Sequence, residues 1–430
     1  MQRISVRNVG PIQEAKININ NLTLLIGEQA SGKSTLAKLI YFFKSIKDEW
    51  TQLGIGALNE ITPDHLINTI RDRFYTYFGS TRKLPEDYRI SFSFDDHKKI
   101  TLEGSPLSVY IEPQSWFHEL VGVVSNYSER INTYRSRNDL VGETRERIEF
   151  LQKLRYAFSD PQESIYIPAG RNITVAYSET FLNSFRAELQ ARVQAIQGRR
   201  QDAKEGDLFI TRDFITHIER VKEEFKGLGI EGYLRFFKED IREILSIRIN
   251  KLLKGKYRYS DSAGEYFLVP QGDNVRLQHA SSGQQEAIRI LQDVLVSLRD
   301  HATRPVFRVI EEPEAHLFPS GQRALIEILA TLASKGSPNS LLLTTHSPYI
   351  LTIVNNLIYA STVSEKAAIE SGFPLQLQLK SESVSAYMID NDGVATSIID
   401  DETGLIGSNI IEDAWDDISG AFDELYALND

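Results

Sequence analysis

The chain has 430 residues, which is enough for two or three domains. Hydrophobic residues make up 41% of it and charged residues 25%, as in ordinary globular proteins, so wholesale disorder is excluded. It contains no cysteine, which excludes disulfides, thiolate zinc sites, iron–sulfur clusters and cysteine nucleophiles.

The net charge of −11 is concentrated at the C-terminus. The last 50 residues hold 13 acidic side chains and no Lys or Arg, which leaves 48 basic against 46 acidic side chains in the first 380 residues. The body is therefore almost neutral, and its charge neither supports nor excludes a local nucleic-acid surface. The first residues lack the apolar core of a secretion signal, and we expect a cytoplasmic protein.

Short strands and helices alternate in the first part of the chain. Polar–apolar alternation, short apolar runs and turn residues predict strands over 4–9, 15–19, 22–26 and 164–168, and an antiparallel meander over 88–111. Helical spacing of apolar side chains predicts helices over 35–46, 60–80 and 115–158.

The second part of the chain begins with a helical stretch, residues 176–255. This stretch shows no sustained heptad, so we expect a compact helical insertion rather than a coiled-coil arm. Strands between 257 and 277 come next, and α/β alternation then predicts a helix over 282–299, a strand over 306–310, a helix over 319–334 and a strand over 340–345. Near the end, Asn391-Asp-Gly393 predicts a β-hairpin.

The uncharged stretch 336–364 is the only candidate for a membrane span. Pro348 divides it into a strand-like half and a helix-like half, so we expect a buried strand followed by a helix and no contact with a membrane. These patterns divide the chain into lobes over residues 1–170 and 257–380, a helical insertion over 171–256, and an acidic hairpin and helix over 381–430.

A phosphate-binding motif follows the apolar strand 22–26. It reads Gly27-Glu28-Gln29-Ala30-Ser31-Gly32-Lys33-Ser34, fits G-x-x-x-x-G-K-[ST] in full and is followed by Thr35 at the start of a helix. The glycines allow backbone N–H groups to turn toward phosphate oxygens, Lys33 reaches the β- and γ-phosphates, and the Ser34 hydroxyl can bind magnesium. We therefore expect ATP and Mg²⁺ as cofactors.

Two adjacent carboxylates, Glu311 and Glu312, end the apolar strand 306–310. The carboxyl ends of strands are where α/β proteins place ligands, so Glu311 can hold magnesium while Glu312 polarises a water molecule. Taken alone, such a pair is also compatible with a solvated strand cap.

Two further segments with candidate site residues flank this pair in the sequence. Ser281, Ser282, Gly283 and Gln284 begin a helix 30 residues before Glu311, and His346 ends a strand 35 residues after it. A serine-rich helix start can bind an anion through its free N–H groups, although by itself it also reads as an ordinary cap. His346 alone would also fit a packed core histidine.

Together these four motifs resemble an ABC-type ATPase head of the SMC/RecF/OLD-like group. Residues 27–34 resemble the Walker A loop, 280–284 a divergent signature motif, 306–312 the Walker B strand, and His346 the switch histidine. The opening strands and the run 311–317 resemble especially the stand-alone ATPases related to the OLD family, which include ATPase subunits of anti-phage systems such as Septu and PARIS. Residues 166–171 match more loosely.

The resemblance implies an α/β P-loop NTPase fold with a mixed central sheet, an antiparallel β meander and a helical insertion. It also implies a homodimer, or a higher homo-oligomer, with ATP sandwiched between subunits. Lys33, Glu312 and His346 would be catalytic, and Ser34 and Glu311 would hold the metal. Ser281, Ser282, Gly283 and Gln284 would close on the γ-phosphate from the partner chain.

The sequence departs from the wider ABC pattern at several positions. Glu311 stands where many relatives have Asp, the signature reads Ala-Ser-Ser-Gly-Gln, and Phe318 replaces a frequent His. No Q-loop glutamine is identifiable, and Arg171 is a candidate nucleotide or interface contact. Asp390-Asn-Asp392 reads as a hairpin turn rather than a metal nuclease site.

Basic clusters are the candidates for DNA contact, although each also fits a solvated face. One cluster comprises Arg248, Lys251, Lys254, Lys256 and Arg258, and the other Arg186, Arg192, Arg199, Arg200 and Lys204. The acidic tail, with Trp415, Phe422 and Leu425, could be a docking helix or a cap on its own domain.

Three functions are compatible with these features. The first is an ATPase that dimerises around ATP and regulates a separate effector protein, a nuclease or toxin, in anti-phage defence. The second is a RecF/SMC-like repair ATPase acting on DNA. The third, a transporter nucleotide-binding subunit, is disfavoured by the divergent signature and the helical insertion.

Overall fold

The structure, a computed structural model, describes residues 1–50, 61–176, 206–270, 272–300, 304–334 and 336–407. The basic cluster from Arg186 to Lys204 and the tail with Trp415, Phe422 and Leu425 lie outside these residues.

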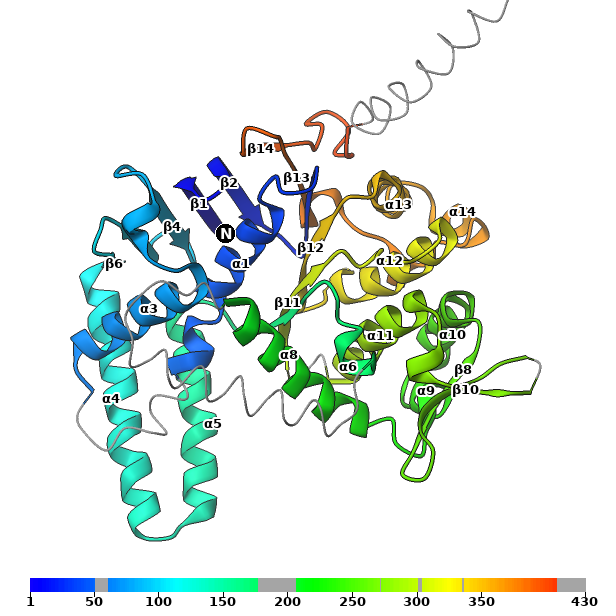
Figure 1. Cartoon of the computed structure of the whole chain (residues 1–430), viewed down its shortest axis with the longest axis horizontal. Helices are drawn as coiled ribbons and strands as arrows, with labels where there is room; N and C mark the ends of the chain where they lie inside the picture. The colour runs from blue at the N-terminus through cyan, green and yellow to red at the C-terminus, as the bar shows by residue number, and fades with distance from the viewer. Residues whose placement is uncertain (51–60, 177–205, 271, 301–303, 335, 408–430) are drawn as a thin grey trace, which may run out of the picture.

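A large mixed β-sheet runs through the molecule (Figure 1). Within the described residues it has 11 strands in the order β6-β5-β4-β1-β2-β14-β13-β3-β12-β11-β7. Their bounds are β1 Gln2–Val9, β2 Ile12–Ile19, β3 Leu22–Gly27, β4 Arg89–Ser93, β5 Lys99–Glu103, β6 Ser108–Glu112, β7 Glu163–Ile167, β11 Val306–Glu311, β12 Ser340–Thr345, β13 Val384–Ile389 and β14 Val394–Ser397.

The sheet has two halves of different character. Strands β13, β3, β12, β11 and β7 run parallel to one another, whereas β2, β1, β4, β5 and β6 pair antiparallel, with β4, β5 and β6 as a meander. The parallel strands β3 and β11 are buried at every residue, and β2 alternates between buried and exposed positions. This difference is expected, because helices cover both faces of a parallel sheet. The prediction of a mixed sheet with a meander is confirmed.

The predicted hairpin around Asn391-Asp-Gly393 is also confirmed, and it belongs to this sheet. Strand β13 pairs with β14 and runs parallel to β3, while β14 runs parallel to β2. The hairpin therefore joins the two halves of the sheet beside the loop that begins at Gly27.

Helices surround the sheet (Figure 1). Their bounds are α1 Lys33–Lys44, α3 Pro63–Phe78, α4 Gln114–Ser136, α5 Leu140–Ala157, α6 Ile173–Ala176, α8 Gly206–Glu223, α9 Gly229–Tyr233, α10 Glu239–Leu253, α11 Ser282–Asp300, α12 Pro319–Ala333, α13 Pro348–Tyr359 and α14 Glu365–Glu370. Helices α4 and α5 pack as a pair that projects from the meander side. The described part of the expected helical insertion contains α6, α8, α9 and α10.

A small antiparallel sheet of three strands lies beside α9. Its strands are β8 Lys256–Ser260, β9 Gly264–Leu268 and β10 Asn274–Arg276. They are the strands that the sequence predicts between 257 and 277.

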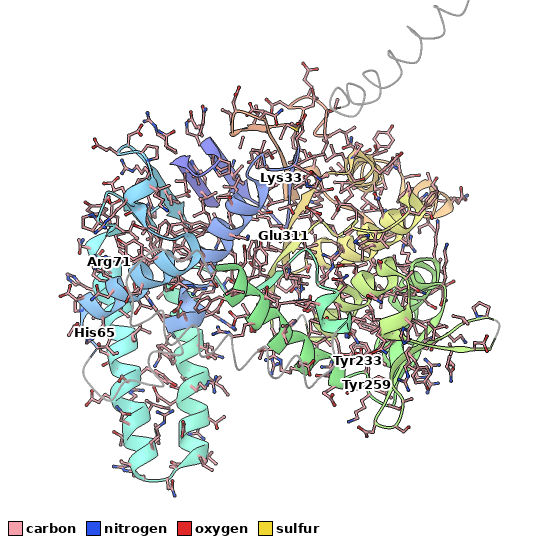
Figure 2. All side chains as sticks on the ribbon, viewed as in Figure 1. Lys33, His65, Arg71, Tyr233, Tyr259 and Glu311 are labelled. Atoms are coloured by element: carbon pink, nitrogen blue, oxygen red, sulfur yellow. The ribbon has the colours of Figure 1, made fainter. Side chains whose placement is uncertain are left out.

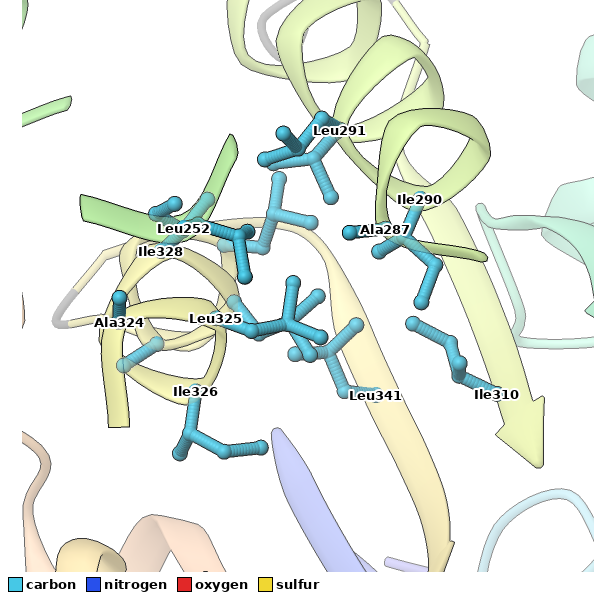
Figure 3. Close-up of a cluster of buried hydrophobic side chains, with 14 of the residues drawn as sticks. Leu252, Ala287, Ile290, Leu291, Ile310, Ala324, Leu325, Ile326, Ile328 and Leu341 are labelled. Carbon is cyan, nitrogen blue, oxygen red and sulfur yellow. The ribbon is translucent and has the colours of Figure 1, made fainter. Parts of the chain in front are cut away.

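Two hydrophobic cores occupy the two faces of the central sheet. Alternate residues of β3 separate them, because Leu24 lies in one core and Leu25 in the other. Figure 3 shows the first core, where Ala287 and Ile290 of α11 lie near Ile310 of β11, and Leu325 of α12 lies near Leu341 of β12. This packing holds α11 against β11, the strand that ends in the two carboxylates, and α12 against the neighbouring strand β12.

The uncharged stretch 336–364 contains β12 and α13, as predicted. Pro348 is the first residue of α13, a position where its missing N–H group is not needed. In the described part of the chain, no helix combines the length and hydrophobicity that crossing a membrane requires.

Candidate nucleotide-binding and hydrolysis site

The predicted site residues lie at one end of the parallel strands. Thr344 of β12 is in register with Leu25 of β3 on one side and with Glu311 of β11 on the other. Since neighbouring strands are about 4.8 Å apart, the phosphate loop and Glu311 lie roughly 10 Å apart with β12 between them. Figure 2 labels Lys33 and Glu311 at this end of the sheet.

The phosphate loop is a tight turn between β3 and α1. Gly32 has φ 108°, and a Cβ atom there would lie 2.4 Å from Ile12 Cδ1, so only glycine fits. Ala30 also adopts a positive φ of 63°. The Ser31 hydroxyl is buried and has no hydrogen-bond partner within the described structure. An unsatisfied buried hydroxyl is costly, which fits a loop that is completed by a polar ligand.

Lys33 is buried at the start of α1 and is 5% exposed. Its ammonium group donates to the carbonyl oxygens of Gly27, at 2.9 Å, and Glu28, at 2.6 Å. Burial lowers the pKa of Lys33, and the negative charges of Glu312 and Glu314 partly oppose this shift. The cation thus lies within the loop and faces acidic neighbours.

Glu311 is held firmly at the end of β11. Its Oε1 accepts a hydrogen bond of 2.7 Å from the Tyr166 hydroxyl, and its Oε2 accepts one of 3.1 Å from the Ala169 N–H. The residue is 7% exposed. The sequence does not indicate the contact between Tyr166 and Glu311, because this contact depends on β7 lying next to β11.

Glu312 and His346 contact each other at the surface of the site. His346 Nε2 lies 3.2 Å from Glu312 Oε1, and both side chains are about one-third exposed, at 31% and 39%. Glu312 has φ 42°, which is unusual for a residue other than glycine. Its N–H donates to the Thr344 carbonyl at 2.9 Å, which holds this backbone in place.

Arg171, the candidate nucleotide or interface contact, is fully buried within the chain. Its guanidinium donates to the carbonyl oxygens of Glu311, at 2.9 Å, and Glu312, at 3.0 Å. Its Nε lies 3.0 Å from Glu286 Oε2 on α11, a charge contact without hydrogen-bond geometry. Arg171 therefore stabilises the backbone at Glu311 and Glu312 from the protein interior.

Glu314 is a third carboxylate at the site, and its position in the run 311–317 does not by itself predict a role for it. Its Oε1 accepts hydrogen bonds from the Thr345 hydroxyl at 2.6 Å and from the His346 N–H at 2.9 Å. Glu314 thus ties the loop after β11 to the segment that carries His346.

The signature-like segment forms the start of α11. The Ser281 hydroxyl accepts from the Gln284 N–H at 3.3 Å, and the Ser281 N–H donates to Gln284 Oε1 at 3.1 Å, which is a reciprocal cap. Ser281 and Ser282 are exposed, and Gly283 is buried against the His316 carbonyl. No hydrogen bond among the described residues joins this segment to the phosphate loop of the same chain.

These residues fit a magnesium–nucleotide ligand. Mg²⁺ prefers oxygen ligands and is usually held by one or two protein groups together with substrate phosphates. The Ser34 hydroxyl at the start of α1 and the Glu311 carboxylate supply such oxygens, and the unsatisfied Ser31 hydroxyl is available to a phosphate.

The family profile described as "AAA ATPase domain" matches residues 1–197 and 159–351, well over half of the chain. The chain belongs to this AAA ATPase family. No curated protein matches the sequence of this AAA ATPase.

Solved structures similar to this AAA ATPase include three SMC head domains. The head bound to the C-winged helix domain of ScpA is 12% identical, with 92% of this chain and 96% of that chain covered and a TM-score of 0.41. The head with an extended coiled coil, bound to the C-terminal domain of ScpA from Pyrococcus furiosus, is 14% identical, with 93% and 96% covered and a TM-score of 0.39. The Thermotoga maritima head is 10% identical, with 92% and 97% covered and a TM-score of 0.35.

The basic cluster between Arg248 and Arg258 lies within the described residues of this AAA ATPase, and three of its side chains form ion pairs within the chain. Arg248 is buried and its Nε lies 2.7 Å from Glu327 Oε2. Arg258 and Lys256 both pair with Glu231. These three charges are thus partly neutralised, which weakens the case for a DNA surface here.

Proposed function

We propose that this protein binds ATP with Mg²⁺ and hydrolyses it. The observation that carries this proposal is the contact of Glu312 with His346 at the carboxyl end of β11. Only β12 separates β11 from β3, the strand that leads into the Lys33 loop. A carboxylate there can accept a proton from an attacking water, and the adjacent imidazole can hold the carboxylate and contact the γ-phosphate.

The other residues of the site prepare this step. Lys33 would leave the Gly27 and Glu28 carbonyls for the β- and γ-phosphates, and the backbone N–H groups of residues 28–35 would surround the phosphate oxygens. Glu311 and Ser34 would hold the metal, which supplies charge neutralisation on the phosphates. Positioning and electrostatics thus account for catalysis, as is usual for phosphoryl transfer.

The experiment that tests hydrolysis compares the wild-type chain with Glu312→Gln. The variant keeps the size of the side chain and removes its basicity, so we expect ATP binding to persist and phosphate release to fall at least about 100-fold. Glu370→Gln, on the exposed helix α14, is the matched control and should retain wild-type turnover. Equal turnover by wild type and Glu312→Gln would refute the assignment of the catalytic carboxylate.

We also propose that the chain dimerises around ATP, with Ser281, Ser282, Gly283 and Gln284 completing the partner's site. The exposure of Ser281 and Ser282, without a described contact to their own phosphate loop, supports this arrangement. By the resemblance to OLD-like ATPases alone, we propose that the dimer controls a separate effector in anti-phage defence. Retention of such an effector by the ATP-bound Glu312→Gln chain tests this, whereas retention of DNA and repair proteins alone would favour the RecF-like alternative.

A further inference from the structure

Tyr166 contacts the predicted metal ligand from the neighbouring strand. Strand β7 runs parallel to β11 with Tyr166 in register with Val309, so its side chain lies on the same face as Glu311. The hydroxyl donates to Glu311 Oε1 at 2.7 Å, and the Ala169 N–H just beyond β7 donates to Oε2 at 3.1 Å. Both oxygens of the carboxylate are therefore fixed by one segment of the chain.

The surroundings of Tyr166 hold its ring in place. The residue is buried, with 3% of its surface exposed. Its ring packs edge-on against Tyr41 of α1, with centroids 5.2 Å apart and planes at 70°. Because α1 begins with Lys33 and Ser34, the ring that holds Glu311 is packed against the helix of the phosphate loop.

We propose that Tyr166 is a positioning residue that orients the Glu311 carboxylate toward the metal of the bound nucleotide, an inference that rests on the proposed function. A glutamate has one more rotatable bond than the aspartate that the ABC pattern has here, so a free Glu311 would lose more conformational freedom on binding a cation. Hydrogen bonds from Tyr166 and Ala169 fix that side chain in advance. A carboxylate has about four acceptor sites, so roughly two remain for a cation or its waters.

The test is Tyr166→Phe, which keeps the ring packed on Tyr41 and deletes only the hydroxyl. Binding of Mn²⁺, a paramagnetic substitute for Mg²⁺, is measured by electron paramagnetic resonance in the presence of a non-hydrolysable ATP analogue. Because a hydrogen bond to a charged group is lost, we expect the Mn²⁺ dissociation constant to rise about 10-fold or more. Binding of a fluorescent ATP analogue in EDTA should not change.

Tyr41→Phe is the matched control, because it removes a hydroxyl from the packed partner ring and no described hydrogen bond joins Tyr41 to Glu311. We expect this variant to bind Mn²⁺ as the wild type does. Unchanged Mn²⁺ binding by Tyr166→Phe would overturn the inference while leaving the proposed function intact. A wild-type chain that binds no Mn²⁺ with the nucleotide analogue would instead overturn the proposed function, and this inference with it.

A second measurement separates positioning from packing. In a Glu311→Asp background the side chain is one methylene shorter, so its carboxylate lies farther from the Tyr166 hydroxyl and their hydrogen bond is weakened or lost. If Tyr166 acts through Glu311, adding Tyr166→Phe should weaken Mn²⁺ binding much less than it does in the wild type. Equal effects of Tyr166→Phe in both backgrounds would overturn the inference, since the hydroxyl would then act without Glu311.

Discussion

Lys33 is held by the backbone of its own loop. Its ammonium group is satisfied by two loop carbonyls, and burial lowers its pKa. Replacing Lys33 by Met removes the cost of burying a charge but leaves these two carbonyls without their donor, so the two effects on stability oppose each other. The role of Lys33 in binding is therefore best measured as the response of the fold to ATP.

We predict that Lys33→Met folds but that its stability does not respond to ATP. A ligand at about 100 times its dissociation constant stabilises a fold by about 2.7 kcal/mol, so ATP should raise the melting temperature of the wild type and leave that of Lys33→Met unchanged. Thermal unfolding with and without ATP measures this. Lys16→Met, at an exposed position on β2, should behave as the wild type. An ATP shift that survives in Lys33→Met would contradict the binding role of this lysine.

At the scale of elements, Arg171 joins three segments around the site. It lies just after β7, donates to the carbonyls of Glu311 and Glu312, and faces Glu286 on α11. Since both side chains of this ion pair are buried, removing only the arginine leaves an uncompensated carboxylate beneath the site.

We predict that Arg171→Met lowers the free energy of unfolding by about 3–5 kcal/mol, and that Arg171→Met combined with Glu286→Met recovers most of the loss. Turnover should stay low in both variants. The Glu312 carbonyl has lost the hydrogen bond from Arg171, which helps to hold the Glu312 backbone at its positive φ. Urea unfolding and phosphate release measure the two effects. Breaking the partly exposed Arg135–Glu143 pair by Arg135→Met should cost less than about 1 kcal/mol. Wild-type turnover in the double variant would show that Arg171 serves stability alone.

The sequence predicts local elements of this fold well and contacts between distant segments poorly. Residues 22–35, with their apolar strand, glycines and helical spacing, indicate β3, the loop and α1 directly, because the information is local. The pairing of β13 with β3 joins segments about 360 residues apart and leaves no local signal. The contacts of Tyr166, Arg171 and Glu314 could not be predicted for the same reason, since each residue acts through a strand or loop that is adjacent only in space.

At the scale of the whole molecule, the proposed dimer places residues of one site on two chains. Lys33 and Glu312 would come from one subunit and Ser282 from the other, so each symmetric dimer would contain two composite sites. Ser282→Glu is a suitable probe. A carboxylate at the first position of α11 stabilises the helix through its dipole, but it repels the negative charge of a γ-phosphate. The chain should fold while failing to complete its partner's site.

We predict that Lys33→Met and Ser282→Glu chains are each inactive alone and regain activity when mixed. In a mixed dimer, the intact Lys33 loop of the Ser282→Glu chain meets the intact Ser282 of the Lys33→Met chain, which restores one site of the two. Random pairing of equal amounts would give up to about one quarter of wild-type phosphate release. Ser282→Thr, which keeps the hydroxyl, should retain most activity by itself. If the mixture stays as inactive as its components, while Ser282→Glu alone hydrolyses ATP normally, then each site is complete within a single chain and the sandwich arrangement is wrong.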